Sequence, residues 1–454
     1  MISFDDILEN KIKTGRYQFK TLGIVGLVEF CDGIEYAYMS ILVAIIQKEW
    51  ELNQQQIASL GSSFLLGMVI GNCICAFLTD IIGRKTTFTI FTGLSVFLIY
   101  FTSICTSYNQ MIMLRLMFGI VFGTSYPLGY VFISEVTEPR YRGRFGYSMG
   151  VLFVIGKIYL AFLCIFYLND FTSGNWRGLI RVNGIPVAIS FILSLFYLKE
   201  TVRYYLNQRE YKVAFEQIDS TIHENQKDTD ILTEEEKQGL INWQEKQIQI
   251  NQEQELNRFG ILSQNYKYIT FKIWILYILA NLQNMSIYLL MPFLFANNNS
   301  NLSSMLFMFI LELVFALLLY VFIDDPNIGG RKMVIGYSSL ILVLANASLY
   351  LFRQHILFFG LLLIKLACRA LFSTLGLVCC ESYPLQLRSQ GTAIAFGIGK
   401  TTSIPSPFFL FPLFYIDPYL PFALMSILSI IMIITNYLIG DDKTMKPLES
   451  HKQD

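Results

Sequence analysis

The sequence predicts an all-helical integral membrane protein whose twelve membrane-spanning helices form two pseudo-symmetric bundles of six. Of the 454 residues, 54% are hydrophobic and only 15% are charged, whereas soluble domains are about 45–50% apolar. The apolar residues gather in segments of about 20 residues, the length that crosses the hydrocarbon core of a bilayer. A short charged motif occurs twice, 247 residues apart, which indicates that one half of the chain repeats the other.

Two sets of six candidate spans lie on either side of a polar stretch. The first six lie near residues 21–46, 57–79, 86–105, 111–134, 145–167 and 178–198. The second six lie near residues 268–293, 303–323, 333–352, 355–380, 391–413 and 418–439. The predicted parts are an N-terminal segment (1–20), a first bundle (21–198), a linker (199–267), a second bundle (268–440) and a tail (441–454).

The linker is rich in Glu, Gln, Lys and Asn and contains amphipathic helical stretches such as residues 234–256. Because it holds too few apolar residues for a core of its own, the sequence predicts a water-facing connection and no small folded domain there.

Basic residues indicate the orientation in the membrane. Those in the short loops on the side of the linker are Arg84, Lys85, Arg140, Arg142, Arg144, Arg331, Lys332 and Arg388. Because positive loops stay in the cytoplasm, the N-terminal segment, the linker and the tail are predicted to be cytoplasmic. Glycosylation patterns starting at Asn298 and Asn301 fall on the opposite side. The sequence leaves open whether the membrane is the plasma membrane or that of an intracellular vesicle.

The repeated motif lies in a turn between two spans. Its first copy runs from Leu78 to Lys85, and its second copy is Ile328–Lys332. An acid and bases beside each other at a helix end can pair with a neighbouring helix in one conformation and release it in another. The alternative is that these charges only fix the topology. Asp80 is present in the first copy while Asn327 replaces it in the second, so the first loop is expected to be the stronger latch.

These loops resemble those of the major facilitator superfamily, whose motif is G-x-L-x-D-x-x-G-R-K, with Ala76 at the first glycine position. Glu135 to Arg142 and Glu381 to Arg388 resemble the segments after its fourth and tenth helices. The resemblance implies a set of gating residues. They are Asp80, Gly83, Arg84, Lys85, Glu135, Arg142, Glu200, Arg203, Gly330, Arg331, Lys332, Glu381 and Arg388.

Two further stretches narrow the resemblance within the superfamily. Residues 200–204, with Val202 in place of proline, resemble the segment after helix six of sugar porters and organic-ion transporters. Residues 15–19 and 31–35 are similar to synaptic vesicle two-related proteins and to bacterial metabolite–proton symporters. The resemblance implies two bundles that rock about a site in the middle of the membrane.

Three acids interrupt the first span. Glu29, Asp32 and Glu35 are spaced so that they spread over only about 120° of a helix. Ionised side chains inside a bilayer are costly and usually serve a function. Asp32 or Glu35 is therefore a candidate proton carrier or cation ligand, and Glu29 is a weaker candidate for the same role. The alternative is a structural pairing with a basic residue elsewhere.

Basic residues within other spans are the candidate partners. Lys157 and Lys400 occupy equivalent places in the two halves, 243 residues apart, and could form an anion site. Alternatively, they reach the membrane surface or neutralise the acids of the first helix. Arg115 resembles the arginine used for proton coupling in the superfamily. The other candidates are Asn284, Glu312, Lys365 and Arg369, with Tyr36, Tyr126 and Tyr288 as aromatic residues that either surround the site or pack.

Glycine pairs at four-residue spacing could allow close helix packing. They are Gly67 and Gly71, Gly119 and Gly123, and Gly146 and Gly150.

The sequence contains no H-E-x-x-H, G-x-S-x-G, Walker or dinucleotide-binding pattern, so no enzyme is predicted. We expect a secondary active, proton-coupled or facilitative transporter of a small organic anion or zwitterion. One alternative is a sugar porter, since Asn281, Gln283 and Asn284 fall together on helix seven. The other is a membrane receptor or vesicle structural protein that does not transport. The expected partners are the lipid bilayer, the solute and protons. The chain is predicted to be monomeric, with no cofactor, metal or nucleic acid.

Overall fold

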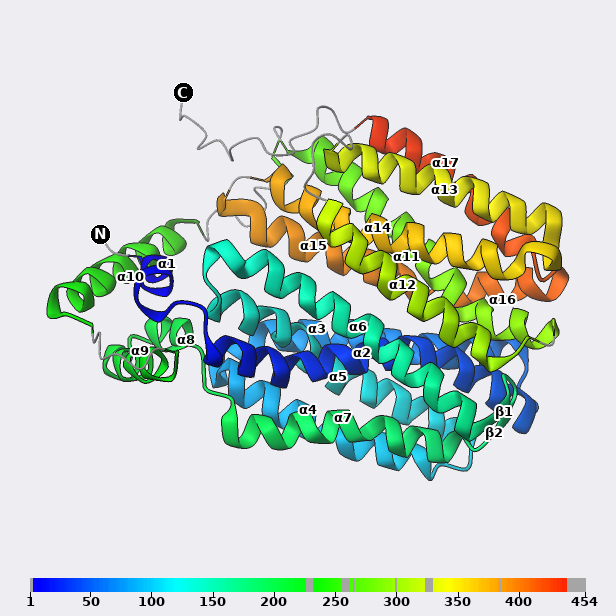
Figure 1. The fold of residues 1–454 in the computed structure, drawn as a ribbon, viewed down its shortest axis with the longest axis horizontal. Helices are drawn as coiled ribbons and strands as arrows, with labels where there is room; N and C mark the ends of the chain where they lie inside the picture. The colour runs from blue at the N-terminus through cyan, green and yellow to red at the C-terminus, as the bar shows by residue number, and fades with distance from the viewer. Residues whose placement is uncertain are drawn as a thin grey trace.

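The computed structural model describes residues 3–225, 232–254, 262–263, 266–298, 300–322, 330–383 and 385–438. Almost all of these residues are helical (Figure 1). The first bundle contains α2 (Arg16–Glu49), α3 (Gln54–Ile82), α4 (Arg84–Ser103), α5 (Tyr108–Val136), α6 (Pro139–Tyr167) and α7 (Trp176–Tyr197). A short hairpin of β1 (Leu168–Asp170) and β2 (Ser173–Gly174) joins α6 to α7.

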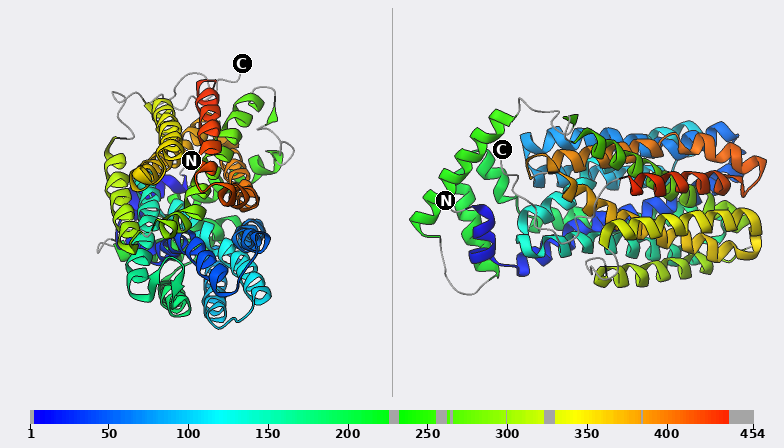
Figure 2. Two further views of the ribbon diagram at one scale, coloured as in Figure 1. Left: turned by 90° about the vertical axis from the view of Figure 1, so that its right-hand side faces the viewer. Right: turned by 90° about the horizontal axis from the view of Figure 1, so that it is seen from above.

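The second bundle lies beside the first, with its helices running along the same direction (Figures 1 and 2). Its helices are α11 (Lys267–Asn297), α12 (Leu302–Phe322), α13 (Gly330–Phe352), α14 (Leu357–Ser382), α15 (Leu385–Ser403), α16 (Ser406–Ile416) and α17 (Leu420–Tyr437). A 3-10 turn, η5 (Arg353–Ile356), connects α13 to α14.

Within the described ranges, nine helical stretches are long and apolar enough to cross a membrane, and one of them runs through both α13 and α14. The long helix α2, which carries the three acids, and the interrupted pair α15 and α16 complete the predicted twelve-span arrangement. The fold class predicted from the sequence is therefore confirmed.

The eleventh span differs from the continuous helix predicted at 391–413. It breaks between Ser403 and Ser406, because Pro405 has no N–H to donate to the preceding turn. The backbone freed by the break is used across the bundle interface. The carbonyl of Ile404 accepts a hydrogen bond of 2.6 Å from Ser62 Oγ of α3.

Glycines let α3 and α5 pack with their backbones in contact. A Cβ on Gly71 would lie 2.1 Å from the carbonyl oxygen of Ile120, and one on Gly119 would lie 2.3 Å from that of Phe64. Two of the three predicted pairs, on α3 and α5, thus permit close approach. The third does not bring two backbones together, because a Cβ on Gly146 has nothing within 4 Å and one on Gly150 would meet the side chain of Arg369 at 2.7 Å.

We expect Gly71→Ala to lower the free energy of unfolding by about 1–3 kcal/mol, because the added methyl group must push two helix backbones apart. Gly146→Ala is the matched control, since the same methyl group meets open space there. Thermal unfolding of the purified variants in one detergent measures the difference. Equal shifts in the two variants would contradict the packing argument.

The N-terminal segment and the linker fold together into a small helical unit at one end of the bundles, here called the cap (Figures 1 and 2). It contains α1 (Phe4–Ile7), the π-helical turn η1 (Leu8–Ile12), α8 (Val202–Asn207), α9 (Tyr211–Asn225) and α10 (Glu234–Gln254). Its buried apolar residues are Phe4, Ile7, Leu8, Ile12, Val202, Leu206, Ala214, Ile218, Ile222, Leu232 and Leu240.

The cap corrects the prediction that the linker forms no folded unit. The linker alone is indeed poor in apolar residues, but the N-terminal segment supplies Phe4, Ile7, Leu8 and Ile12 to the same core. Two segments that are both polar on average can share a core when each contributes one apolar face.

Candidate functional site

Charged side chains from both bundles gather between the two halves, and this group is called the charge cluster here. The described helices α2, α5, α6, α12, α14 and α15 each contribute to it. Its members are Glu29, Asp32, Glu35, Arg115, Lys157, Glu312, Lys365, Arg369 and Lys400. Most of these side chains are almost completely buried, and Arg369 and Lys400 are partly buried.

One acid–base pair of the cluster lies entirely within the first bundle. Arg115 Nη1 donates to Glu35 Oε2 at 2.7 Å, and both side chains are buried. The guanidinium also lies over the rings of Tyr38 and Phe118, with its carbon 5.5 Å and 6.0 Å from their centres. Glu35 is therefore held by a fixed, desolvated partner.

A second group of charges joins the two bundles. Lys157 of α6 donates to the carboxylate of Glu312 of α12 and, at 3.0 Å, to the hydroxyl of Tyr288 of α11. Lys365 of α14 lies 3.8 Å from the other oxygen of Glu312. One carboxylate thus serves two ammonium groups at the interface between the halves.

Asp32, Arg369 and Lys400 differ from the other members because none of them forms a hydrogen bond or an ion pair with a residue that the structure describes. Asp32 Oδ1 and Lys400 Nζ are buried and make no hydrogen bond with any residue that the structure describes. Lys400 is close enough to Asp32 and Glu29 for an electrostatic attraction, and its Nζ lies 4.1 Å from the ring centre of Tyr126.

The structure gives the two symmetry-related lysines different acids. Lys157 pairs with Glu312, while Lys400 faces Asp32 and Glu29. This arrangement favours the alternative in which each lysine neutralises carboxylates over the one in which both form a single anion site. Lys400 alone of the two has no hydrogen-bond partner within the described residues.

Aromatic side chains surround the cluster. Tyr36 lies with its ring centre 5.8 Å from those of both Phe153 and Tyr288, and Tyr130 donates to Glu29 at 2.9 Å. Sequence reasoning named Tyr36 and Tyr288 but missed Tyr130 and Phe153. Helical spacing could have found them, since Tyr130 lies four residues after Tyr126 and Phe153 four before Lys157.

The three amides of helix seven do not act together. Gln283 donates to the Met425 carbonyl at 2.6 Å and accepts from Asn346 at 3.1 Å, so it holds α11 against α17 and α13. Asn281 donates to the Tyr277 carbonyl of its own helix. Asn284 is half-buried, one helical turn before Tyr288, and so shares its side of α11.

The first copy of the repeated motif forms a network at the cap end of the bundle. Arg84 lies 3.4 Å from Asp80 and 3.5 Å from Glu135, which connects the α3–α4 turn to α5. The backbone N–H of Lys85 donates to Glu200 at 3.0 Å. Burial raises the pKa of Glu200, although the hydrogen bonds that its carboxylate accepts from backbone N–H groups, that of Lys85 among them, oppose the shift.

Gly83 makes this turn possible. Its φ of +95° is strained for other residues, and a Cβ would lie 2.3 Å from Glu200 Oε2. Arg142 and Arg203 both reach Asp5 of the cap, at 3.0 Å and 2.6 Å. Sequence reasoning missed Asp5 because no motif marks it.

The second copy of the motif is only partly described. Residues 323–329, which include Asn327, the surroundings of Gly330, and the side chains of Arg331, Glu381 and Arg388 lie outside the described part of the structure. The ammonium of Lys332 lies 3.4 Å from the carbonyl oxygen of Tyr437.

We expect Arg84→Gln to lower the free energy of unfolding by about 1–3 kcal/mol, because it leaves the part-buried carboxylate of Glu135 without a charged partner. Lys85→Gln removes one positive charge at the neighbouring position, where the backbone N–H, and not the side chain, makes a hydrogen bond among the described residues. It should change the melting temperature much less. A melting temperature that falls equally in both variants would argue against a specific role of the Arg84 contacts.

Two helical bundles around buried opposing charges define a membrane transporter of the two-bundle class. The family model of the Major Facilitator Superfamily matches residues 25–407. The chain belongs to this superfamily, as the sequence motifs predicted.

Curated relatives agree with this assignment. The 4-hydroxybenzoate transporter PcaK of Acinetobacter baylyi is 24% identical over 87% of this chain and 84% of its own length. The putative niacin/nicotinamide transporter NiaP of Bacillus subtilis is 28% identical, over 39% of this chain and 43% of its own. Synaptic vesicle glycoprotein 2B of Mus musculus is 24% identical over 44% of this chain, and the match spans only 31% of that protein.

Solved structures share the fold. The xylose transporter XylE from E. coli in its inward open conformation has a TM-score of 0.74 at 15% identity, covering 95% of this chain and 98% of that one. Its partially occluded inward open conformation has a TM-score of 0.70, also at 15% identity, covering 94% and 100%.

Proposed function

We propose that this chain carries a small organic anion together with a proton by alternating access of the two bundles. The observation that carries this proposal is the charge balance of the buried cluster. Five basic residues face four acids when every group is ionised. One positive charge is then left over, in a region where an uncompensated charge is costly. A bound anion would offset it.

Asp32 and Lys400 are the groups proposed to act directly. Both present a buried polar atom with no hydrogen-bond partner among the described residues, whereas Glu35 and Lys157 are already paired. Lys400 would attract the carboxylate of the solute. Protonation of Asp32 would release Lys400 from its attraction to that acid, so binding of the proton and of the anion would favour each other.

A small aromatic carboxylate is the first substrate class to test. Lys400 lies against the ring of Tyr126, and Tyr36 and Tyr288 are in ring contact nearby. Rings and an ammonium group together suit an aromatic acid. The relatives PcaK and NiaP, named for 4-hydroxybenzoate and niacin/nicotinamide, support the same class.

A neutral sugar is the second candidate. Asn284 is half-buried and faces the same side of α11 as Tyr288, where an amide could hydrogen-bond a hydroxyl group. The likeness to the xylose transporter concerns the fold alone, so the evidence for a sugar substrate is the position of Asn284.

The cap is proposed to face the cytoplasm, with both ends of the chain on that side. The basic loop residues Arg84, Lys85 and Arg142 lie at the cap end of the first bundle, as the positive-inside rule expects. The predicted gating residues there would hold this end in one conformation and release it in another.

Uptake of labelled 4-hydroxybenzoate, nicotinate and xylose into proteoliposomes tests the proposal. We expect uptake of an aromatic acid that rises when the outside is more acidic. Xylose uptake without uptake of either acid would contradict the anion proposal and support the sugar. Uptake of an acid at a rate that does not depend on the pH gradient would contradict proton coupling. No uptake of any of the three compounds would favour a receptor or structural role.

A further inference from the structure

A second charged site lies outside the charge cluster, where the cap meets the first bundle. An open pocket of about 620 Å³ is lined by Arg16, Lys20, His223, Glu224 and Asn225. The first two residues belong to the start of α2, and the last three end α9. The site is therefore built from two segments that are about 200 residues apart in the chain.

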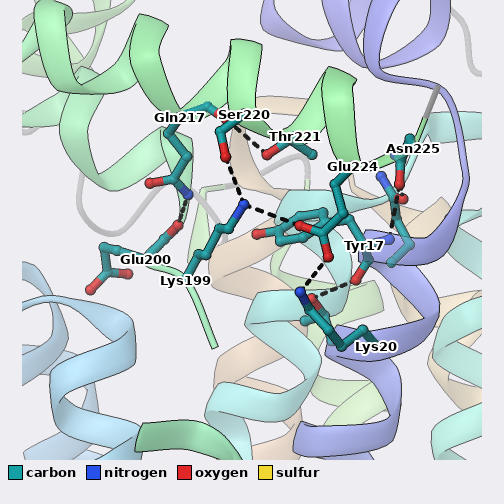
Figure 3. Close-up of polar contacts among 11 residues, drawn as sticks. Tyr17, Lys20, Lys199, Glu200, Gln217, Ser220, Thr221, Glu224 and Asn225 are labelled. Carbon is teal, nitrogen blue, oxygen red and sulfur yellow. Dashed lines mark hydrogen bonds and ion pairs between the residues drawn. The ribbon is translucent and has the colours of Figure 1, made fainter. Parts of the chain in front are cut away.

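Asn225, one of the lining residues of this pocket, connects α9 to the start of α2 through its side-chain amide (Figure 3). Its side-chain oxygen accepts from the backbone N–H of Tyr17 at 2.9 Å. Its side-chain nitrogen donates to the carbonyl oxygen of Lys13 at 2.8 Å and to Gln18 Oε1 at 2.9 Å. One amide thus fixes the end of α9 against the start of α2, so the backbone on both sides of the pocket is held in place.

The charges of the pocket are unequal. Glu224 lies between Lys20 and Lys199, accepting from both (Figure 3), with 3.1 Å to Lys199 Nζ. Burial alone would raise the pKa of Glu224, but the hydrogen bonds from these two lysines lower it, so the group is an anion at neutral pH. Two lysines share its single charge.

Arg16 and His223 are the other two basic residues that line the pocket. Both are exposed, and neither makes a hydrogen bond or an ion pair with another residue in the described ranges. Arg16 and Lys20 are four residues apart and therefore project from the same side of α2. The pocket is thus lined by three basic side chains, of which Lys20 already donates to the carboxylate of Glu224.

We propose that this pocket binds a phosphate-bearing anion. A phosphate group has several acceptor oxygens and a charge that suits a guanidinium and an ammonium together. The bound phosphate would accept the hydrogen bond that Lys20 now donates to Glu224, while Glu224 would still accept one from Lys199. The phosphate would thereby connect α2 to α9.

The position of the pocket suits a lipid headgroup as well as a soluble phosphate compound. Lys20 directly precedes the apolar run of α2, and the adjacent Phe19 is 62% exposed. Basic residues next to a membrane span and beside an exposed apolar side chain suit contact with anionic lipid headgroups. The two sources share one chemistry and differ in whether an acyl chain accompanies the phosphate.

Binding measurements on the full-length protein test the site independently of transport. One arm uses nanodiscs that contain phosphatidylinositol 4-phosphate, with retained lipid counted by native mass spectrometry. The other arm titrates the detergent-purified protein with inositol trisphosphate by calorimetry. We expect the wild-type chain to bind in at least one arm, and Arg16→Gln and His223→Gln each to weaken that binding. The expected loss for Arg16→Gln is about tenfold, the size of one charge-assisted hydrogen bond.

Lys212→Gln is the matched control, because it removes one positive charge from an exposed position near the start of α9, outside the pocket lining. Binding in the lipid arm alone assigns the site to a headgroup, and binding of inositol trisphosphate as well assigns it to phosphate compounds generally. No binding by the wild type in either arm would overturn the proposal. So would a loss in Lys212→Gln equal to that in Arg16→Gln. His223→Gln, which leaves α2 unchanged, decides the question if Arg16→Gln unfolds.

Discussion

Glu312→Gln is expected to destabilise the protein by about 3–5 kcal/mol, the largest effect of any single substitution considered. Removing one partner of a buried ion pair leaves an uncompensated charge in the interior. Here it leaves two, because the same carboxylate serves Lys157 and Lys365. The midpoint of thermal unfolding in detergent, together with the yield of folded protein, measures the loss.

Two further variants separate this effect from a general loss of charge. Glu234→Gln removes an acid from α10 whose side chain is 89% exposed, and it should leave the midpoint nearly unchanged. Combining Glu312→Gln with Lys157→Met removes one of the orphaned ammonium groups, so the double variant should recover part of the stability. A double variant that is less stable than Glu312→Gln would refute the pairing described here.

Asp32→Asn is expected to abolish accumulation driven by a pH gradient while exchange of solute across the membrane continues. One pH unit is worth about 1.4 kcal/mol, so coupling one proton to one solute can support about tenfold accumulation. Asparagine is nearly the same size but cannot take up the proton. Proteoliposomes with an inward proton gradient, compared with counterflow at equal pH, give the two readouts.

Glu29→Gln is the comparison for this experiment, because Glu29 lies one turn away on the same helix but accepts a hydrogen bond from Tyr130. It should reduce accumulation less than Asp32→Asn does. Full accumulation by the Asp32 variant would remove that residue from the proposed coupling.

The sequence was sufficient to predict the charge cluster but not its pairings. Charged residues stand out in apolar spans, so Asp32, Glu312 and Lys400 could each be selected without a structure. Which acid meets which base depends on the rotation of each helix and on which helices adjoin. The sequence of a single span does not reveal the rotation of its helix or the identity of its neighbours. Lys157 therefore pairs with Glu312 on α12 instead of facing Lys400.

The sequence analysis did not predict the cap or the break between α15 and α16, and the reasons differ. Composition was counted segment by segment, and neither the N-terminal segment nor the linker has a core alone, although Phe4 and Ile218 are buried in the same one. Pro405 was visible in the sequence. The apolar run on both sides of it nevertheless favoured one continuous span, since prolines are tolerated within membrane helices.

Glu312 and its two lysines have a consequence for how the bundles could turn against each other. An ion pair with a single partner on each side must separate when the surfaces slide, and the separated charges would face a nearly dry interior. Glu312 belongs to the same bundle as Lys365, so its carboxylate keeps one ammonium neighbour when Lys157 of the first bundle moves away. Movement of the bundles at the interface between α6, α12 and α14 would then leave one unpaired charge, the ammonium of Lys157, where a simple ion pair would leave two.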